Sequence, residues 1–187
     1  MSDEVYTYDL RQEQPIIAAL VRQASTRYAQ RFAQRPVNAI EVGFWVEGAR
    51  LVVRLISNLA YEFNRAIYPT DYSETVDRAS YGEHVTIPSW ELLNSLSGSV
   101  DMRVRDDGGH DVTLHAIRDG YQEGWRDTVE AIGRNVMRVV FDAHADLFTG
   151  VPLTDPCEIT VYEDEDSSLA WYLRVSGDAI GFKPTGA

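Results

Sequence analysis

The stretch VNAIEVGFWVEGARLVVRLIS, from Val37 to Ser57, decides the fold of this chain. Apolar side chains occupy every second position from Ile40 to Val46, and this two-residue period is typical of a strand with one buried face. The dipeptide Glu47-Gly48 supplies a turn, and a run rich in β-branched residues follows it. The stretch therefore predicts a β-hairpin.

Two amphipathic helices flank this hairpin in the sequence. Between Glu13 and Gln34, apolar residues recur at the i, i+3, i+4, i+7 spacing of one helix face: Ile17, Leu20, Val21, Ala24, Tyr28 and Phe32. A second stripe runs from Tyr121 to Leu147 over about seven turns, and Gly150 follows its end. A shorter helix is predicted after Pro88-Ser89, where a capping residue, an early acid and Gly98 mark its limits.

Two further hairpins are predicted from alternating runs. One spans Val100–Leu114 around an Asp-Gly-Gly turn, and the other pairs Glu158–Tyr162 with Ser168–Val175. Asn58–Glu83 has no clean period, and we expect an irregular or partly helical segment there. The sequence thus predicts an α+β fold in which a single domain, residues 1–187, packs antiparallel β-hairpins against an N-terminal helix and a long helix in the C-terminal half.

The composition fits a packed domain that does not span a membrane. Of the 187 residues, 44% are hydrophobic, which supplies the apolar surface that a core needs. No window approaches the roughly 18 uninterrupted apolar residues of a membrane helix, and the N-terminal MSDEVYTYDL is acidic, unlike a signal peptide. The one cysteine, Cys157, cannot form an internal disulfide. We therefore expect a cytoplasmic protein.

The charge of the chain indicates the kind of partner. Its formal net charge is −12 and its pI is near 4.7. Nucleic acids and anionic membranes reward positive charge, whereas an acidic protein attracts basic partners. We therefore expect a basic protein as partner, and neither nucleic acid nor membrane.

No pattern in the sequence predicts a catalytic residue, a metal site or a cofactor. His110 and His115 would face opposite sides of one strand, so ordinary surface positions on a hairpin are expected. The acids and histidine of Asp142–Asp146 are two residues apart on a helix and diverge around its axis. The run Glu163–Asp166 lacks the central glycine and the distal glutamate of a calcium-binding EF-hand loop.

The strongest feature is an acid-rich stretch from Val139 to Leu173 that contains no lysine or arginine. It carries eight acids, two thirds of the net −12: Asp142, Asp146, Asp155, Glu158, Glu163, Asp164, Glu165 and Asp166. Two explanations stay open. Either arginines of the same chain, such as Arg22, Arg27 and Arg31 on the first helix, pair with these acids, or another protein does.

The second explanation predicts an acidic recognition surface at the C-terminal hairpin. Aromatic side chains beside acids are the combination found at interface hot spots with charge-accelerated encounter. The predicted partner-binding residues are Asp155, Glu158, Tyr162, Glu163, Asp164, Glu165, Asp166 and Trp171.

The tail DAHADLFTGVPLTDPCEITVYEDEDSSLAWYL (Asp142–Leu173) reads as a helix end followed by a strand that runs into acids. Together with the early helix and AIEVGFWVEGARLVVRLIS (Ala39–Ser57), this tail resembles small bacterial α+β immunity proteins of toxin systems. The resemblance covers about a third of the chain. It implies a cytoplasmic inhibitor that occludes the active site of a toxin with acidic residues.

The function expected from the sequence is that of a non-enzymatic, acidic protein-binding domain, with immunity to a basic cognate toxin as its sharpest form. Two alternatives stay open. One is a small hydrolase-like enzyme that uses carboxylates and a histidine, and the other is an assembly protein of a phage or secretion apparatus. The sequence leaves the oligomeric state undetermined.

Overall fold

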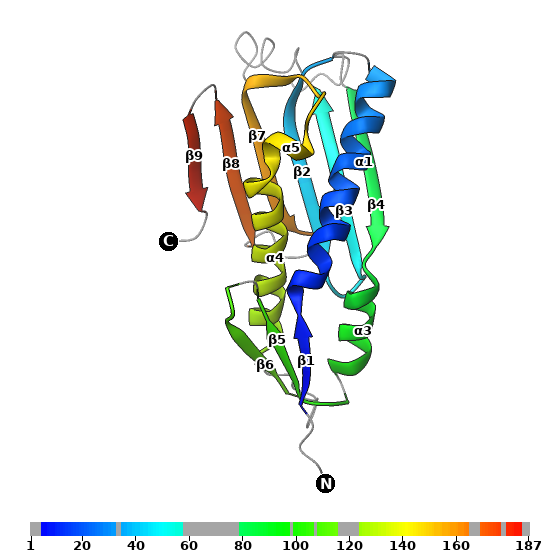
Figure 1. Ribbon diagram of the computed structural model, residues 1–187, viewed down its shortest axis with the longest axis vertical. Helices are drawn as coiled ribbons and strands as arrows, with labels where there is room; N and C mark the ends of the chain where they lie inside the picture. Colours follow the sequence, from blue (N-terminus) through cyan, green and yellow to red (C-terminus); the bar gives the residue numbers. More distant parts are fainter. Residues whose placement is uncertain are drawn as a thin grey trace, which may run out of the picture.

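The computed structural model describes residues 5–32, 35–57, 79–97, 99–106, 108–115, 124–164, 169–176 and 179–184. Figure 1 shows an α+β fold, as the sequence predicted. Its elements are β1 (Tyr6–Asp9), a 3-10 helix (Leu10–Glu13), α1 (Gln14–Phe32), β2 (Val37–Trp45), β3 (Arg50–Ser57), β4 (Ala79–Thr86), α3 (Pro88–Ser97), β5 (Met102–Arg105), β6 (Asp111–Leu114), α4 (Trp125–Asp142), α5 (His144–Leu147), β7 (Leu153–Glu163), β8 (Ala170–Ser176) and β9 (Ala179–Pro184).

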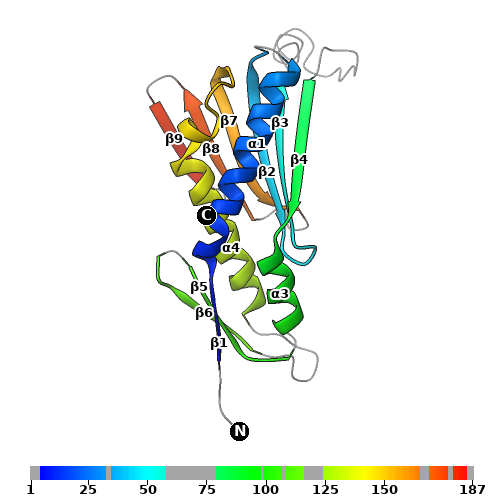
Figure 2. The same cartoon turned by 45° about the vertical axis from the view of Figure 1, so that its right-hand side comes forward.

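The large sheet has six strands in the order β4-β3-β2-β7-β8-β9. Its central pair, β2 and β7, is parallel, and all the other neighbours are antiparallel. Helices α1, α4 and α5 lie on one face of this sheet, as Figures 1 and 2 show from two directions. No helix in the described part of the chain lies on the opposite face, which we call the helix-free face.

A small sheet of three strands, β1-β5-β6, lies beyond one end of the large sheet and beside the first turns of α4 (Figure 1). Strand β1 is parallel to β5, and β5 is antiparallel to β6. The buried apolar side chains of both sheets belong to one cluster, which includes Tyr8 and Met102 from the small sheet and Ile40 and Phe44 from the large one. The hydrophobic core is therefore continuous from one sheet to the other.

The three predicted hairpins are confirmed. Strands β2 and β3 pair with Glu41 opposite Arg54, strands β5 and β6 pair around the Asp-Gly-Gly turn, and β7 pairs with β8. The predicted short helix is α3, and the predicted N-terminal helix is α1, which begins one residue after Glu13. In α1 the buried face is the predicted one, because Ile17, Leu20, Val21, Ala24 and Tyr28 are all buried.

The long helix is interrupted, which the apolar stripe did not predict. Within the described residues, α4 starts at Trp125 and ends at Asp142; Ala143, with φ −105° and ψ 13°, leaves the helix before α5 begins. At this break the ring nitrogen Nδ1 of His144 lies 2.8 Å from the carbonyl oxygen of Phe141. Leu147 is nevertheless buried, so the stripe continues across the break.

The expectation for Asn58–Glu83 was wrong for its last part. Residues Ala79–Glu83 form the beginning of β4, which pairs along its whole length with β3, whereas residues 58–78 lie outside the described residues. Strands β1 and β9 were also not predicted, nor were the two parallel pairs. A short strand at a sheet edge needs no clear apolar alternation, because its partner supplies most of the hydrogen bonds that define it.

In the part of the chain that the structure describes, no helix combines the length and the apolar character that a membrane crossing would require.

Candidate functional site

A carboxyl group lies fully buried where the small sheet meets the helices. Glu13, at the end of the 3-10 helix, has no solvent-exposed surface. The hydroxyl of Tyr8 and the indole Nε1 of Trp90 both donate hydrogen bonds to Oε1 of Glu13, the latter over 2.6 Å. Among the described residues, the second oxygen, Oε2, has a long 3.4 Å contact with Nδ2 of Asn135, and the hydroxyl of Ser89 also lies near the carboxyl group. Three elements, β1, α3 and α4, thus converge on one carboxyl group.

Asn135, which is also fully buried, extends these hydrogen bonds. Its Nδ2 donates to the carbonyl oxygen of Leu10 over 3.0 Å, and its Oδ1 accepts a hydrogen bond from Nε2 of Gln14 over 3.0 Å. The side chains of Tyr8, Glu13, Gln14, Trp90 and Asn135 form a continuous set, which we call the Glu13 cluster. It satisfies polar groups that would each cost about 1–3 kcal/mol if buried without a partner.

Burial controls the electrostatics of the Glu13 cluster. Loss of hydration raises the pKa of Glu13 to about 7, although the hydrogen bonds from Tyr8 and Trp90 act in the opposite direction. Burial also raises the pKa of Tyr8, and the adjacent Glu13 adds to the effect, so the phenol stays neutral. In the described residues, no arginine, lysine or histidine lies within 4.0 Å of Glu13. The carboxyl group can therefore exchange a proton near neutral pH, but a substrate cannot reach it in this conformation.

Sequence reasoning missed the Glu13 cluster. It placed Glu13 at the start of the first helix, a position where an acid is ordinarily solvated. The 3-10 helix that precedes α1 rotates this side chain inward, and nothing in the local spacing signals that rotation. Asn135, a polar residue within the apolar stripe of the long helix, was the one signal available, because such a residue requires a buried partner.

The structure does not bring the predicted partner-binding residues onto one surface. Alternate residues of β7 point to opposite faces: Cys157, Ile159 and Val161 are buried under the helices, while Glu158 and Tyr162 lie on the helix-free face. Asp155 and Asp164 are exposed. Asp155 lies near the start of β7 and Asp164 follows its last residue, so these two acids lie toward opposite ends of the strand.

Two of the predicted residues are packed into the protein. Glu163 is only 6% exposed. The ring of Trp171 contacts α4 at Gly133 and lies 6.3 Å from the ring of Phe44, on the helix side of the sheet. Trp171 is therefore part of the packing between β8 and α4 and does not share a surface with Tyr162. The other two predicted residues, Glu165 and Asp166, lie outside the described residues.

The arginines of α1 do not pair with the acid-rich stretch in the described part of the chain. Arg27 pairs with Glu83 of β4, and the guanidinium of Arg31 lies 5.5 Å from the ring centroid of Phe32. Among the described residues, no basic side chain lies within 4.0 Å of the following acids: Asp142, Asp146, Asp155, Glu158 and Asp164.

The helix-free face carries a second polar cluster, centred on Tyr162. The hydroxyl of Tyr162 accepts a hydrogen bond from Nη1 of Arg54 over 3.1 Å, and the same Nη1 lies 3.6 Å from Oε2 of Glu41. Tyr162 is on β7 and Arg54 on β3, so the phenol must cross the intervening strand β2. It does so over Gly43, where a Cβ would lie only 3.1 Å from the Tyr162 ring. Gly43 thus permits a contact that spans three strands.

Aromatic and arginine side chains surround this cluster. The strand register places Trp45 opposite Arg50, Thr160 opposite Tyr172, and Glu158 opposite Arg174, all on the side of the sheet that α1 and α4 leave uncovered. Tyr172 is 41% exposed. The helix-free face therefore combines exposed aromatic surface, arginines and the acids Glu41 and Glu158.

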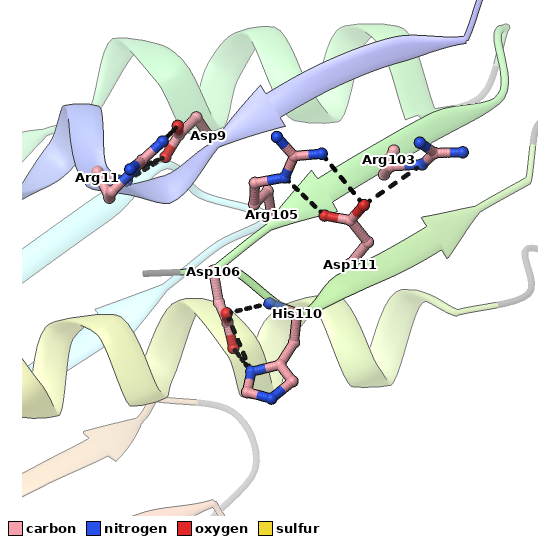
Figure 3. Close-up of polar contacts among 7 residues, drawn as sticks. All are labelled: Asp9, Arg11, Arg103, Arg105, Asp106, His110 and Asp111. Carbon is pink, nitrogen blue, oxygen red and sulfur yellow. Dashed lines mark hydrogen bonds and ion pairs between the residues drawn. The ribbon is translucent and has the colours of Figure 1, made fainter. Parts of the chain in front are cut away.

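His110 and His115 lie on the surface of the small sheet, as expected. Figure 3 shows Nδ1 of His110 facing the carboxylate of Asp106 in the β5–β6 turn, at 3.2 Å from Oδ2. On the same sheet, Arg103 and Arg105 both approach Asp111, and Asp9 pairs with Arg11. The arginine–aspartate contacts are exposed pairs of opposite charge, whereas Asp106 is only 7% exposed. In the described residues, no group of three or more histidine, cysteine or acidic side chains could hold a metal ion.

No family model matches this chain, and no significant match was found among curated proteins or solved structures. The candidate sites therefore rest on the geometry of this chain alone.

Proposed function

We propose that this chain is a non-enzymatic protein-binding domain that engages a basic partner protein through its helix-free face. The observation that carries the proposal is the Tyr162–Arg54–Glu41 cluster on a sheet face that no described helix covers. Tyrosine, tryptophan and arginine are the residue types that most often dominate binding energy at protein interfaces. Trp45, Tyr162 and Tyr172 supply such side chains from three different strands.

The charges at the border of this face favour a basic partner. Glu158 lies on the face itself, and Asp155 and Asp164 are exposed at opposite ends of β7. Asp155 and Asp164 have no basic side chain within 4.0 Å in the described residues, so their field is available for attraction over roughly the Debye length, about 10 Å at 0.1 M salt; Glu158 lies opposite Arg174. A net charge of −12 adds long-range steering toward a positively charged surface.

The sharpest form of this proposal is a bacterial, cytoplasmic immunity protein that covers the active site of a basic toxin. The resemblance of Asp142–Leu173 to such proteins supports this form. The alternative of an enzyme draws no support from Glu13, the described carboxyl group whose pKa is most clearly raised, because Glu13 is completely buried.

Two charge reversals with the same change in net charge test the proposal. The first variant, Glu158→Arg, changes an acid on the helix-free face, and the second, Asp142→Arg, changes an acid at the end of α4 on the opposite side. Both acids are exposed and lack a basic side chain within 4.0 Å in the described residues. The probe is the protein encoded beside this gene, in a catalytically inactive form. We expect Glu158→Arg and Tyr172→Ala each to weaken binding at least about tenfold through faster dissociation.

Asp142→Arg should lower only the association rate, and that effect should disappear in 1 M salt, where the Debye length is about 3 Å. Equal affinities for the wild type, Glu158→Arg and Tyr172→Ala would refute the assignment of the face. A neighbouring protein that does not bind at all would refute the immunity form of the proposal.

A further inference from the structure

The Glu13 cluster joins parts of the fold that lie on different sides of it. Within the cluster, Tyr8 belongs to β1, Trp90 to α3 and Asn135 to α4. The ring of Trp90 also lies 6.5 Å from that of Phe44, edge to face, in the middle of the large sheet. Trp90 is completely buried, so its position depends on both contacts.

Helix α3 in turn supports the turn between β2 and β3. One helical turn after Trp90, Nδ2 of Asn94 donates to the carbonyl oxygens of Val46, over 2.8 Å, and Glu47, over 3.1 Å. At the start of α3, the amide of Ile87 donates to the carbonyl oxygen of Ala49 over 2.7 Å. The backbone of this turn is therefore held by α3, and the turn carries Trp45 and Arg50 at its two ends.

The two oxygens of Glu13 are not equivalent. Oε1 accepts the hydrogen bonds from Tyr8 and Trp90, whereas in the described part of the chain the contact of Oε2 is the long one of 3.4 Å with Asn135. Oε2 can therefore carry a proton without the loss of a strong hydrogen bond. A negative charge at the same place would be buried without a cation, which is costly in a protein interior.

We infer that the protonation state of Glu13 controls how firmly α3 is held against the rest of the protein. Glu13 is protonated in the closed structure, in which α3 is packed as described here. Its ionisation loosens α3, and with α3 the β2–β3 turn. The groups that face Glu13 are the titratable phenol of Tyr8 from β1, the neutral Ser89 and Trp90 from α3, and the neutral Asn135 from α4. None of them can supply a compensating positive charge. The inference concerns the free protein and does not require the proposed partner.

The sign of the effect follows from linkage. The pKa of Glu13 is raised from its ordinary 4.5 to about 7 in the closed structure. The contribution of Glu13 to the stability of the closed structure is therefore fully present below pH 4.5 and is lost as the pH rises through 7. If Glu13 regains its ordinary pKa when α3 opens, the opening equilibrium increases between pH 5 and pH 8 on the order of 10- to 100-fold.

Hydrogen exchange measured from pH 5 to pH 8 tests the inference, with rates corrected for the pH dependence of unprotected amides. Protection of the α3 amides, such as those of Leu93 and Asn94, should fall with rising pH in the wild type and stay constant in Glu13→Gln. Glutamine keeps an oxygen acceptor for Tyr8 and Trp90 but cannot ionise. The matched control Glu130→Gln changes an exposed acid that pairs with Arg134 on α4, and it should retain the wild-type slope.

A second measurement needs no variant. The infrared C=O band of a protonated carboxylic acid should be present in the wild type at pH 6, where ordinary carboxyl groups are ionised, and should disappear as the pH rises through about 7. Equal pH slopes in the wild type and Glu13→Gln, or no protonated carboxyl band at pH 6, would overturn the inference.

Discussion

Replacement of Gly133 by alanine should destabilise the protein, although the same change in an exposed helix would stabilise it. Gly133 lies in the middle of α4, where alanine would ordinarily gain about 1 kcal/mol over glycine. Here a Cβ atom would lie 2.5 Å from Cη2 of Trp171, 2.6 Å from Cζ of Phe44 and 2.7 Å from Cζ3 of Trp171. Carbon atoms pack at about 3.5–4.0 Å, so both rings would have to move by about 1 Å.

The ring of Phe44 has no free space for this movement. Phe44 is completely buried and contacts the rings of both Trp90 and Trp171. Overpacking of a filled core typically costs about 1–3 kcal/mol, and sometimes more. Because three contacts would fall below 3.0 Å, we take the upper end of that range, which leaves a net loss of about 2 kcal/mol after the gain in helix propensity.

Urea denaturation followed by tryptophan fluorescence measures this loss directly. Gly82→Ala is the matched control, because the nearest atom to its Cβ would be 3.5 Å away, and its effect should be much smaller. In the background of Trp171→Leu, where the two clashing atoms of Trp171 are absent and only the contact with Phe44 remains, Gly133→Ala should cost clearly less than in the wild type. A Gly133→Ala variant as stable as the wild type would show that α4 can move off the sheet, and would refute this reasoning.

Two further predictions concern buried groups. The thiol of Cys157 is completely buried, and its pKa is raised to about 12. An aromatic disulfide reagent should therefore modify this thiol only as fast as the protein opens. Modification of the folded protein at the rate seen in denaturant would contradict the burial of Cys157. Asn135→Ala should lower the free energy of unfolding, measured in urea, by about 1–3 kcal/mol, because the carbonyl of Leu10 and the side-chain amide of Gln14 both lose a partner. A decrease below about 0.5 kcal/mol would show that water replaces the Asn135 side chain.

The sequence allowed the local elements to be predicted where one face of an element is buried. The alternation from Ile40 to Val46 and the spacing from Ile17 to Tyr28 reflect such faces directly. Pairing between distant strands leaves no such signal. The parallel register of β2 with β7, and of β1 with β5, depends on the packing of the whole chain, so the sequence could not predict it.

The candidate sites were predicted less well, and for a physical reason. Acids that are adjacent in the sequence of a strand point to opposite faces, so the dense run at the end of β7 splits into a buried Glu163 and an exposed Asp164. In addition, a contact between residues that are distant in the sequence was not predicted. Tyr162 and Arg54 are 108 residues apart in the chain, yet they form one contact because Gly43 leaves room between them.

The central parallel pair of the large sheet sets the order in which the protein can fold. Val37 on β2 pairs with Leu153 on β7, so these neighbours are 116 residues apart in the chain. The β2–β3 hairpin is synthesised before β7, so one edge of β2 lacks its parallel partner until β7 has also been synthesised. Such a high contact order predicts slow folding, and the exposed edge of β2 is the surface that a chaperone would have to protect in the meantime.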